Sequence, residues 1–317
     1  MRKDVVLLLA PLPEGVLARF EAEFLHLRFV DGLDPVLLDQ NLAETDIIFG
    51  LPPFKRLDDA RQLSWVQLAS AGVPRRLCPI AKNRGMLVTN LSGLYGPTIA
   101  EHALGMLTVL ARNMHVAFRN QSARQWDRTV AKTMSDLHGK TLGIVGLGNI
   151  GLSIARLAQA YGMRVVGCRR RPQVTPYVDC VYPLDHLREM LAEADHLAVA
   201  APLTPATEGM LGPAEFGALR PGAIYVNVSR GLIAQEAALC AALDSGQVSA
   251  AGLDVFAVEP LPADHRFWTD PRVLVTPHYS GETVNQGLLP IERFARNLRA
   301  RLENRPLEGV VDLEWGY

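Results

Sequence analysis

The stretch that most constrains the fold of this 317-residue chain is TLGIVGLGNIGLSIARLAQAYG, residues 141–162. It carries three glycines in the spacing G-x-G-x-x-G, directly after an apolar run and directly before an amphipathic helical pattern. In this context the first glycine permits a tight turn, the second lets a pyrophosphate approach the backbone, and the third lets helix and strand pack closely. The stretch therefore predicts a dinucleotide site at a helix N-terminus, the alternative being a glycine-rich turn without a ligand. The expected cofactor-binding residues of the loop are Gly146, Gly148, Asn149, Ile150 and Gly151.

Three consecutive arginines follow the next predicted strand, in the stretch VVGCRRRP, residues 165–172. An acid usually stands after this strand where the cofactor ribose has two free hydroxyls, because a carboxylate accepts hydrogen bonds from both. Here the position holds Arg169, whose guanidinium can pair with a 2′-phosphate, and Arg170 and Arg171 add charge or stack on the adenine. We therefore expect NADP(H) to be preferred, with NAD(H) possible. The alternative is a solvated basic turn that binds no ligand.

The rest of the chain alternates between short β-rich runs and amphipathic helical patterns, which indicates a parallel α/β architecture. A long buried helix is expected from Pro97, with Thr98 and Glu101 in capping-box spacing, and another helix over 287–304. The length suits two domains of ordinary size. The strands expected after the long helix are 141–146, 164–168, 196–201, 223–228, 250–255 and 272–276.

Composition argues against several classes of protein. Lysine plus arginine (32) nearly balance aspartate plus glutamate (33), so no overall field draws the chain to nucleic acid or an anionic membrane, and neither is expected as a partner. The apolar run at residues 5–10 follows an acid and is short for an export signal, so it predicts a first strand. No stretch is long and apolar enough to cross a bilayer.

The cysteines lack the spacing of disulfide, redox or metal motifs, so we expect reduced thiols in a cytoplasmic protein. The sequence contains neither H-E-x-x-H nor a G-x-S-x-G elbow, so neither a metal site nor a serine hydrolase is expected. The four cysteines are Cys78, Cys168, Cys180 and Cys240.

Three chemically active residues follow the last three predicted strands: Arg230 in SRG, Glu259 in AVEP and His278 in PHYSG. Ligands of open parallel sheets bind at the carboxyl ends of the strands, so we expect these side chains at one edge. Each alone is more often structural, as a surface cation, a turn carboxylate or a capping histidine. The other histidines, including His102 on the long helix, are expected to be packed or capping groups.

The three residues fit hydride transfer to a 2-oxo acid. Arg230 can bind the substrate carboxylate and polarise the carbonyl, and protonated His278 can give its proton to the carbonyl oxygen as hydride arrives from the nicotinamide. Glu259, paired with His278, orients the imidazole and favours its protonated form. Reduction then needs the imidazolium, and oxidation the neutral ring.

Seven motifs, in order, resemble those of the D-isomer-specific 2-hydroxyacid dehydrogenases. The resemblance implies two doubly wound parallel-sheet α/β domains with a cleft between them. A flavodoxin-like substrate domain comprises 1–97 plus 285–317, and a Rossmann-type dinucleotide-binding domain comprises 98–284. It also implies a homodimer held largely by the inserted domain, including the polar interval near Trp126. The motifs are SAGV (70–73), TIAEHAL (98–104), GIVGLGNIG (143–151), PLTPAT (202–207), VNVSRG (226–231), GLDVFAVEP (252–260) and VTPHYSG (275–281).

Residue roles also follow from the resemblance. It implies that Arg230, Glu259 and His278 are catalytic and that the backbone of Gly72 and Val73 binds the substrate carboxylate, beside Arg230 and His278. Further cofactor contacts are expected at Pro202, Thr207, Val228, Ser229, Asp254 (to the nicotinamide carboxamide) and Gly281. Candidates to line the substrate cleft are Leu51, Pro52, Tyr95 and Trp268.

Arg169, in place of the usual acid of the family, resembles the NADP-preferring members, which are often glyoxylate or hydroxypyruvate reductases. We therefore expect NADPH-dependent reduction of such a small 2-oxo acid to the D-2-hydroxy acid, with His278 as acid and base. One alternative is a dinucleotide-sensing binding protein like the related corepressors, and another is a dehydrogenase for a different small acid such as phosphite. The stretch TPHYSG also resembles formate dehydrogenases, but those pair their histidine with glutamine rather than with a residue like Glu259.

Overall fold

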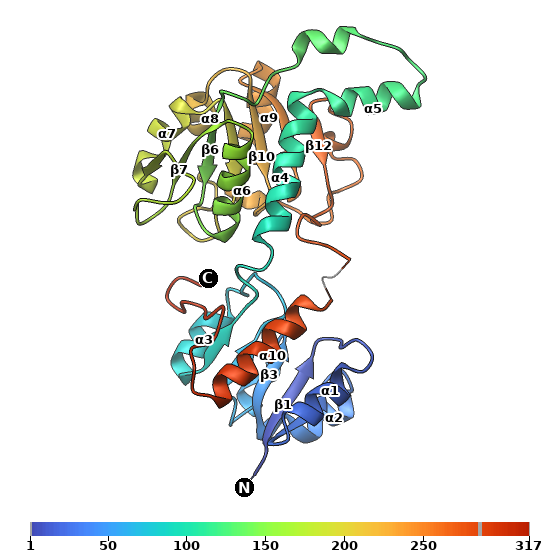
Figure 1. Ribbon diagram of the computed structural model, residues 1–317, viewed down its shortest axis with the longest axis vertical. Helices are drawn as coiled ribbons and strands as arrows, with labels where there is room; N and C mark the ends of the chain where they lie inside the picture. The colour runs from blue at the N-terminus through green and yellow to red at the C-terminus, as the bar shows by residue number, and fades with distance from the viewer. Residues whose placement is uncertain (1, 285–286, 317) are drawn as a thin grey trace. The chain divides into compact units, whose positions relative to one another are not determined.

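The computed structural model describes residues 2–284 and 287–316, which form two compact units (Figure 1). The first unit comprises residues 1–95 and 283–317, and the second comprises residues 96–282. Both units are α/β and their sheets are built from parallel strand pairs, which confirms the predicted fold class. The substrate and dinucleotide-binding roles of the two units stay predictions.

The first unit contains a five-stranded sheet in the order β2-β1-β3-β4-β5, with helices on both faces. Helices α1 (Val16–Glu23) and α10 (Leu289–Leu302) pack on one face, and α2 (Pro35–Asn41) and α3 (Leu77–Arg84) pack on the other. The end of the chain thus returns to the sheet formed by its beginning. The strands are β1 (Asp4–Leu9), β2 (Leu27–Asp31), β3 (Thr45–Gly50), β4 (Trp65–Gln67) and β5 (Leu87–Thr89).

A buried polar network fixes α10 on this sheet. The Asn297 amide donates to Gln67 Oε1 (2.8 Å) and accepts from the Glu308 N–H (2.8 Å). Gln67 Oε1 also accepts from Thr89 Oγ1, which in turn accepts from Trp65 Nε1, each bond being 2.8 Å long. Because buried amides are costly when unpaired, these bonds specify how the C-terminal helix docks.

The second unit contains a seven-stranded sheet in the order β12-β11-β10-β9-β6-β7-β8. The chain starts at β6 and builds outward in both directions, so the topological switch point lies between β6 and β9, where ligands of such sheets bind. Strand β8 was not predicted, and none of its three residues is fully buried. The strands are β6 (Thr141–Val145), β7 (Arg164–Cys168), β8 (Cys180–Tyr182), β9 (His196–Val199), β10 (Ala223–Asn227), β11 (Val248–Leu253) and β12 (Val273–Val275).

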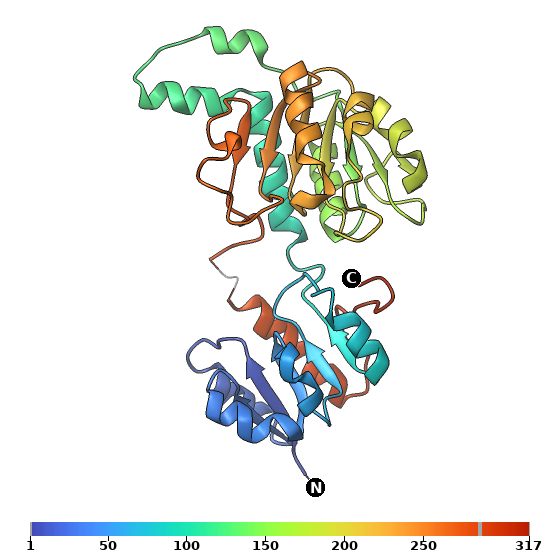
Figure 2. The same cartoon turned by 180° about the vertical axis from the view of Figure 1, so that it is seen from behind.

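Helices cover both faces of this sheet. Helices α4 (Gly96–Ala111) and α6 (Asn149–Ala160) pack together on one face, toward the viewer in Figure 1. Helices α7 (Leu187–Glu193), α8 (Pro213–Ala218) and α9 (Glu236–Ser245) cover the other face, seen in Figure 2. Short 3₁₀ helices span Leu42–Glu44, Phe54–Asp59, Thr129–Thr133, Leu184–His186, Gly231–Ile233 and Arg266–Trp268.

The start of α4 differs from the prediction. The helix begins at Gly96, so Thr98 lies inside the first turn and is not the N-cap residue. Pro97 is tolerated there because the first N–H groups of a helix have no intrahelical acceptor. A Cβ on Gly96 would lie 2.9 Å from Ser153 Oγ and 3.0 Å from the Asn149 carbonyl oxygen, so glycine permits the close packing of α4 on α6.

Helix α5 (Met114–Ser122) projects beyond the sheet from the end of α4 (Figure 1). Trp126, in the segment that follows, is 93% exposed. The homodimer expected to involve this segment stays a prediction. In the described ranges, no helix has both the length and the apolar character needed to span a bilayer.

Candidate active site

The glycine loop between β6 and α6 has three glycines in three different environments. Gly146 has a φ of +95°, and a Cβ there would lie 2.5 Å from the backbone of Ala201. A Cβ on Gly151 would lie 2.0 Å from the Gly146 carbonyl oxygen. A Cβ on Gly148, by contrast, would meet no atom within 4 Å. The first and third glycines are therefore required for the turn and for packing, whereas Gly148 faces open space.

The start of α6 offers backbone N–H groups that have no partner within the described part of the chain, beside that open space. Gly148 is the N-cap residue, and in residues 2–284 and 287–316 no side-chain hydrogen bond caps this helix start. The first N–H groups of a helix lack intrahelical acceptors, and the helix dipole favours negative charge in front of them. Donors at Asn149, Ile150 and Gly151, with no side chain on Gly148, fit the diphosphate of a dinucleotide.

The arginine stretch lies beside the segment that follows β8. The Arg169 N–H donates to the Tyr182 carbonyl oxygen (3.1 Å), which joins the ends of β7 and β8. In residues 2–284 and 287–316, neither Arg169 nor Arg171 forms an ion pair with a carboxylate. These two guanidinium groups can therefore pair with an added phosphate without giving up a carboxylate.

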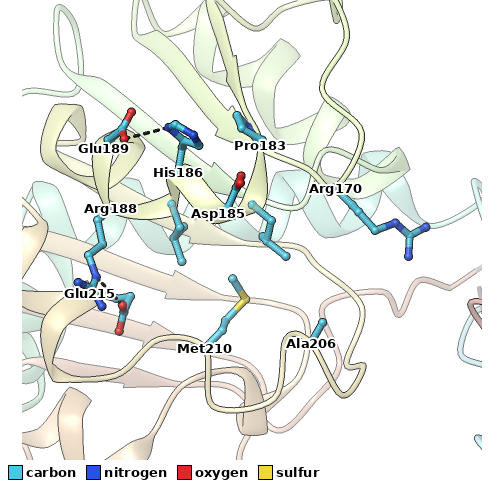
Figure 3. Close-up of a pocket in the computed structure, with 11 residues that line it drawn as sticks. Arg170, Pro183, Asp185, His186, Arg188, Glu189, Ala206, Met210 and Glu215 are labelled. Atoms are coloured by element: carbon cyan, nitrogen blue, oxygen red, sulfur yellow. Dashed lines mark hydrogen bonds and ion pairs between the residues drawn. The ribbon is translucent and has the colours of Figure 1, made fainter.

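A pocket of about 900 Å³ lies next to the arginine stretch (Figure 3). Two basic side chains of its wall are already paired: His186 Nδ1 lies 2.9 Å from Glu189 Oε1, and Arg188 Nε lies 2.9 Å from Glu215 Oε1. Arg170 belongs to the same wall. The lining residues are Arg170, Pro183, Leu184, Asp185, His186, Leu187, Arg188, Glu189, Ala206, Met210 and Glu215.

The structure places His278 and Glu259 in contact. His278 Nδ1 lies 2.7 Å from Glu259 Oε2, and the imidazole is 45% exposed. Glu259 Oε1 accepts from the Phe256 N–H (2.9 Å), so the carboxylate is oriented by its own turn. With Nδ1 donating to the carboxylate, Nε2 can accept a proton in the neutral ring and donate one in the protonated ring. The pair is therefore equipped for proton exchange at Nε2.

Arg230 follows β10 and is exposed. The Asn227 side chain shapes its turn by donating to the Arg230 carbonyl oxygen (3.1 Å) and accepting from the Ser229 N–H (3.0 Å). The guanidinium Nη1 donates to the Ser229 carbonyl oxygen (2.6 Å) and, in the part of the chain that is described, pairs with neither Glu259 nor His278. The structure thus joins two of the three predicted catalytic residues by a hydrogen bond, and the place of Arg230 beside them stays a prediction.

Several other predicted cofactor residues use their side chains within the protein. Thr207 is buried, and its hydroxyl donates to the Pro202 carbonyl oxygen (2.7 Å). Val228 packs in the core, and the buried Ser229 hydroxyl donates to the Ala201 carbonyl oxygen. Their contacts with a cofactor stay predictions, and the same holds for the half-buried Gly281.

Asp254 is entirely buried, and its carboxylate is hydrogen-bonded by residues of the loop that carries His278. It accepts from Thr276 Oγ1 and from the N–H groups of Tyr279 and Ser280. The predicted contact with the nicotinamide carboxamide stays a prediction. The sequence did not reveal the neighbours of Asp254 in the fold, which include His102, whose Nε2 lies 3.8 Å from Asp254 Oδ1.

The predicted carboxylate-binding residues Gly72 and Val73 lie in the first unit, after β4, and are half-buried. Their loop is held by Ser70 Oγ, which donates to the Gly72 carbonyl oxygen (2.9 Å), and by Asn90, whose amide donates to Ala71 (2.7 Å). The candidate lining residues differ in exposure: Leu51 and Trp268 are exposed, Tyr95 is half-buried and Pro52 is buried. Their roles stay predictions.

The second unit of the chain matches a known protein family over most of its length. Residues 104–280 match the model described as D-isomer specific 2-hydroxyacid dehydrogenase, NAD binding domain. Among curated proteins, D-3-phosphoglycerate dehydrogenase of Methanocaldococcus jannaschii is 30% identical over 323 residues, which cover 97% of this chain and 59% of that protein. The chain therefore spans somewhat more than half the length of that relative.

Solved structures match over nearly the whole chain. A D-isomer specific 2-hydroxyacid dehydrogenase family protein of Aeromonas salmonicida is 32% identical, with a TM-score of 0.83 and coverage of 98% of this chain and 99% of that one. An NADPH-dependent glyoxylate/hydroxypyruvate reductase of Sinorhizobium meliloti, crystallised with NADP and sulfate, is 26% identical, with a TM-score of 0.82 and coverage of 99% and 100%.

Proposed function

Because the chain belongs to the D-isomer-specific 2-hydroxyacid dehydrogenase family, we propose that it reduces a small 2-oxo acid to the D-2-hydroxy acid with NADPH. The substrate we propose is glyoxylate, hydroxypyruvate or a compound of similar size. The observation that carries this proposal is the 2.7 Å contact between His278 and Glu259, both of which follow strands of the sheet that bears the glycine loop. When bound, the nicotinamide dinucleotide supplies or accepts the hydride that is exchanged with the substrate carbon.

The residues of the chain handle the proton and the carboxylate. In the direction of reduction, His278 gives a proton from Nε2 to the carbonyl oxygen. Glu259 holds the proton on Nδ1 and compensates the positive charge of the imidazolium. Arg230 binds the carboxylate of the substrate through two charge-assisted hydrogen bonds. In the reverse direction neutral His278 accepts the proton of the hydroxyl.

Preference for NADPH is part of the proposal. It is supported by Arg169 in place of an acid, by the absence of a carboxylate partner for Arg169 and Arg171 in the described ranges, and by a pocket beside them. A charge-assisted phosphate contact predicts at least a tenfold preference, or ~1.4 kcal/mol. Steady-state kinetics with NADPH and NADH test this, and Arg169→Asp should shrink or reverse the preference.

A panel of 2-oxo acids tests the substrate class. It contains glyoxylate, hydroxypyruvate, pyruvate and 3-phosphohydroxypyruvate. The last is included because one similar protein is a D-3-phosphoglycerate dehydrogenase. His278→Ala should abolish turnover while NADPH still binds, since the imidazole lies outside the glycine loop. If no acid of the panel is reduced, or if His278→Ala keeps full turnover, the proposed function is wrong. NADPH binding without turnover would favour a dinucleotide-sensing protein instead.

A further inference from the structure

The buried carboxylate of Asp254 organises the loop that carries His278. Asp254 Oδ1 accepts from Thr276 Oγ1 (2.6 Å) and from the Tyr279 N–H (3.1 Å), and Oδ2 accepts from the Ser280 N–H (3.0 Å). These donors come from residues on both sides of His278 in the chain. A carboxylate with 0% exposure is stabilised only by such bonds, so the loop is bound tightly around it.

The direction of the hydrogen bonds identifies a further member of this network. The Thr276 hydroxyl has one proton and gives it to Asp254, so it must accept in its other contact. That contact is with His102 Nε2 at 3.0 Å, which therefore carries a proton. The result is a directed chain from His102 through Thr276 to Asp254, with each group donating to the next.

His102 lies on helix α4, whereas Asp254 follows β11 and Thr276 follows β12. Its side chain is 19% exposed, and the ring meets the Tyr279 ring edge to face, with centroids 5.5 Å apart. Burial lowers the pKa of His102 below its ordinary value, and the nearby Asp254 opposes this only in part. At neutral pH the ring is therefore neutral and offers one N–H, at Nε2.

The backbone of His278 shows what the network holds in place. His278 has a φ of +53°, in the left-handed region that residues other than glycine rarely adopt, and its N–H donates to the Thr276 carbonyl oxygen (3.0 Å). Such a conformation persists only where the surroundings impose it. The bonds from Thr276, Tyr279 and Ser280 to one carboxylate impose it here. With the backbone so held, Nδ1 of His278 meets Glu259.

We propose that His102 and Thr276 are positioning residues for His278: the chain from His102 to Thr276 to Asp254 holds residues 276–280 in the conformation that presents the imidazole to Glu259. This inference rests on the proposed function for its kinetic test. It assigns neither residue a contact with substrate or cofactor.

Two substitutions of similar size at Thr276 test whether its hydrogen bonds position His278. Thr276→Val keeps the shape and removes both hydrogen bonds, whereas Thr276→Ser keeps them. We expect Thr276→Val to lower kcat about 10- to 100-fold with unchanged affinity for NADPH, since misplacing a catalytic group by about 1 Å costs this much. Thr276→Ser should stay within about threefold of the wild type. A purely structural role would lower stability in Thr276→Val without separating kcat from cofactor binding.

His102 is tested with a second pair. His102→Leu removes the donor, and His102→Gln retains an N–H near the position of Nε2. We expect His102→Leu to resemble Thr276→Val, and His102→Gln to recover most of kcat. The double variant His102→Leu/Thr276→Val should be no slower than the slower single variant, because both substitutions break one chain. Independent, multiplicative losses would overturn the proposal, as would equal kcat values for Thr276→Val and Thr276→Ser.

A readout without substrate keeps this inference separate from the proposed function. In ¹⁵N-histidine-labelled protein, the ring nitrogen signals of His278, assigned by their loss in His278→Ala, report which nitrogen bears the proton. The wild type should hold the Nδ1–H form, and Thr276→Val should lose that preference. If the wild type reduces no 2-oxo acid, the proposed function fails, and this spectrum alone decides the inference. Unchanged His278 signals in Thr276→Val would refute it.

Discussion

Alanine at Gly148 and at Gly151 should separate cofactor binding from folding. A Cβ on Gly151 would lie 2.0 Å from the Gly146 carbonyl oxygen, and real Cβ atoms approach no closer than 3.0 Å, so α6 must shift by roughly 1 Å. Such overpacking typically costs about 1–3 kcal/mol. For a unit of the size of residues 96–282 that lowers Tm by roughly 2–12 °C. A Cβ on Gly148 meets no atom within 4 Å, and its φ of −89° and ψ of −164° suit alanine.

Gly148→Ala should therefore change the free energy of unfolding by less than about 0.5 kcal/mol. Its methyl group would stand where the diphosphate is expected, so the Kd for NADPH should rise at least about tenfold, or ~1.4 kcal/mol. Thermal unfolding of the apoprotein and fluorescence titration with NADPH measure the two effects. Wild-type NADPH affinity in Gly148→Ala would show that the diphosphate does not lie at this helix start, and wild-type stability in Gly151→Ala would refute the packing argument.

Three further substitutions test the His278–Glu259 pair, the buried His196 and the docking of the C-terminal helix α10. Glu259→Gln should lower kcat for reduction about 10- to 100-fold with unchanged NADPH affinity, because the amide cannot compensate the His278 imidazolium; steady-state kinetics would contradict this if kcat were unaltered. Burial lowers the pKa of His196 from 6.5 to about 4, so the unfolded chain takes up a proton first and stability falls as pH drops through this range, by roughly 3 kcal/mol in total. His196→Asn, which keeps an acceptor for the Ile224 N–H, should reduce that loss in urea denaturation at pH 7 and pH 4.5. Asn297→Leu should cost about 3 kcal/mol in urea denaturation, because it leaves buried partners unpaired, and a cost below about 1 kcal/mol would be inconsistent with this network.

Short-range pattern predicted most of the secondary structure, and the reasons for the failures are physical. The strands of both sheets are apolar runs bounded by turn residues, so their pattern is visible in the sequence. Strand β8 has no fully buried residue, whereas the other three-residue strands, β4, β5 and β12, each have at least one. Thr98 matched a capping box, yet α4 begins at Gly96, so Thr98 lies inside its first turn.

The site could be predicted in part for a related reason. Parallel strands bring their carboxyl ends to one edge, which made it reasonable to expect His278 near Glu259. The same argument placed Arg230 with them, and this part stays a prediction, because a strand end does not determine where a long side chain points and the guanidinium bonds to the Ser229 carbonyl oxygen. Asp254 was expected to face the cofactor, and its burial and three donors depend on the folded loop.

The sequence by itself determined the glycine loop, the alternation of strands and helices, and the chemical types of the residues at the strand ends, because these depend on neighbours a few positions apart. Only the tertiary structure decided that His102 bonds to Thr276, 174 positions away, and that Thr276 bonds to Asp254. Hydrogen bonds are directional and short, so a pattern of residue types cannot identify partners that meet only when the helix packs on the sheet.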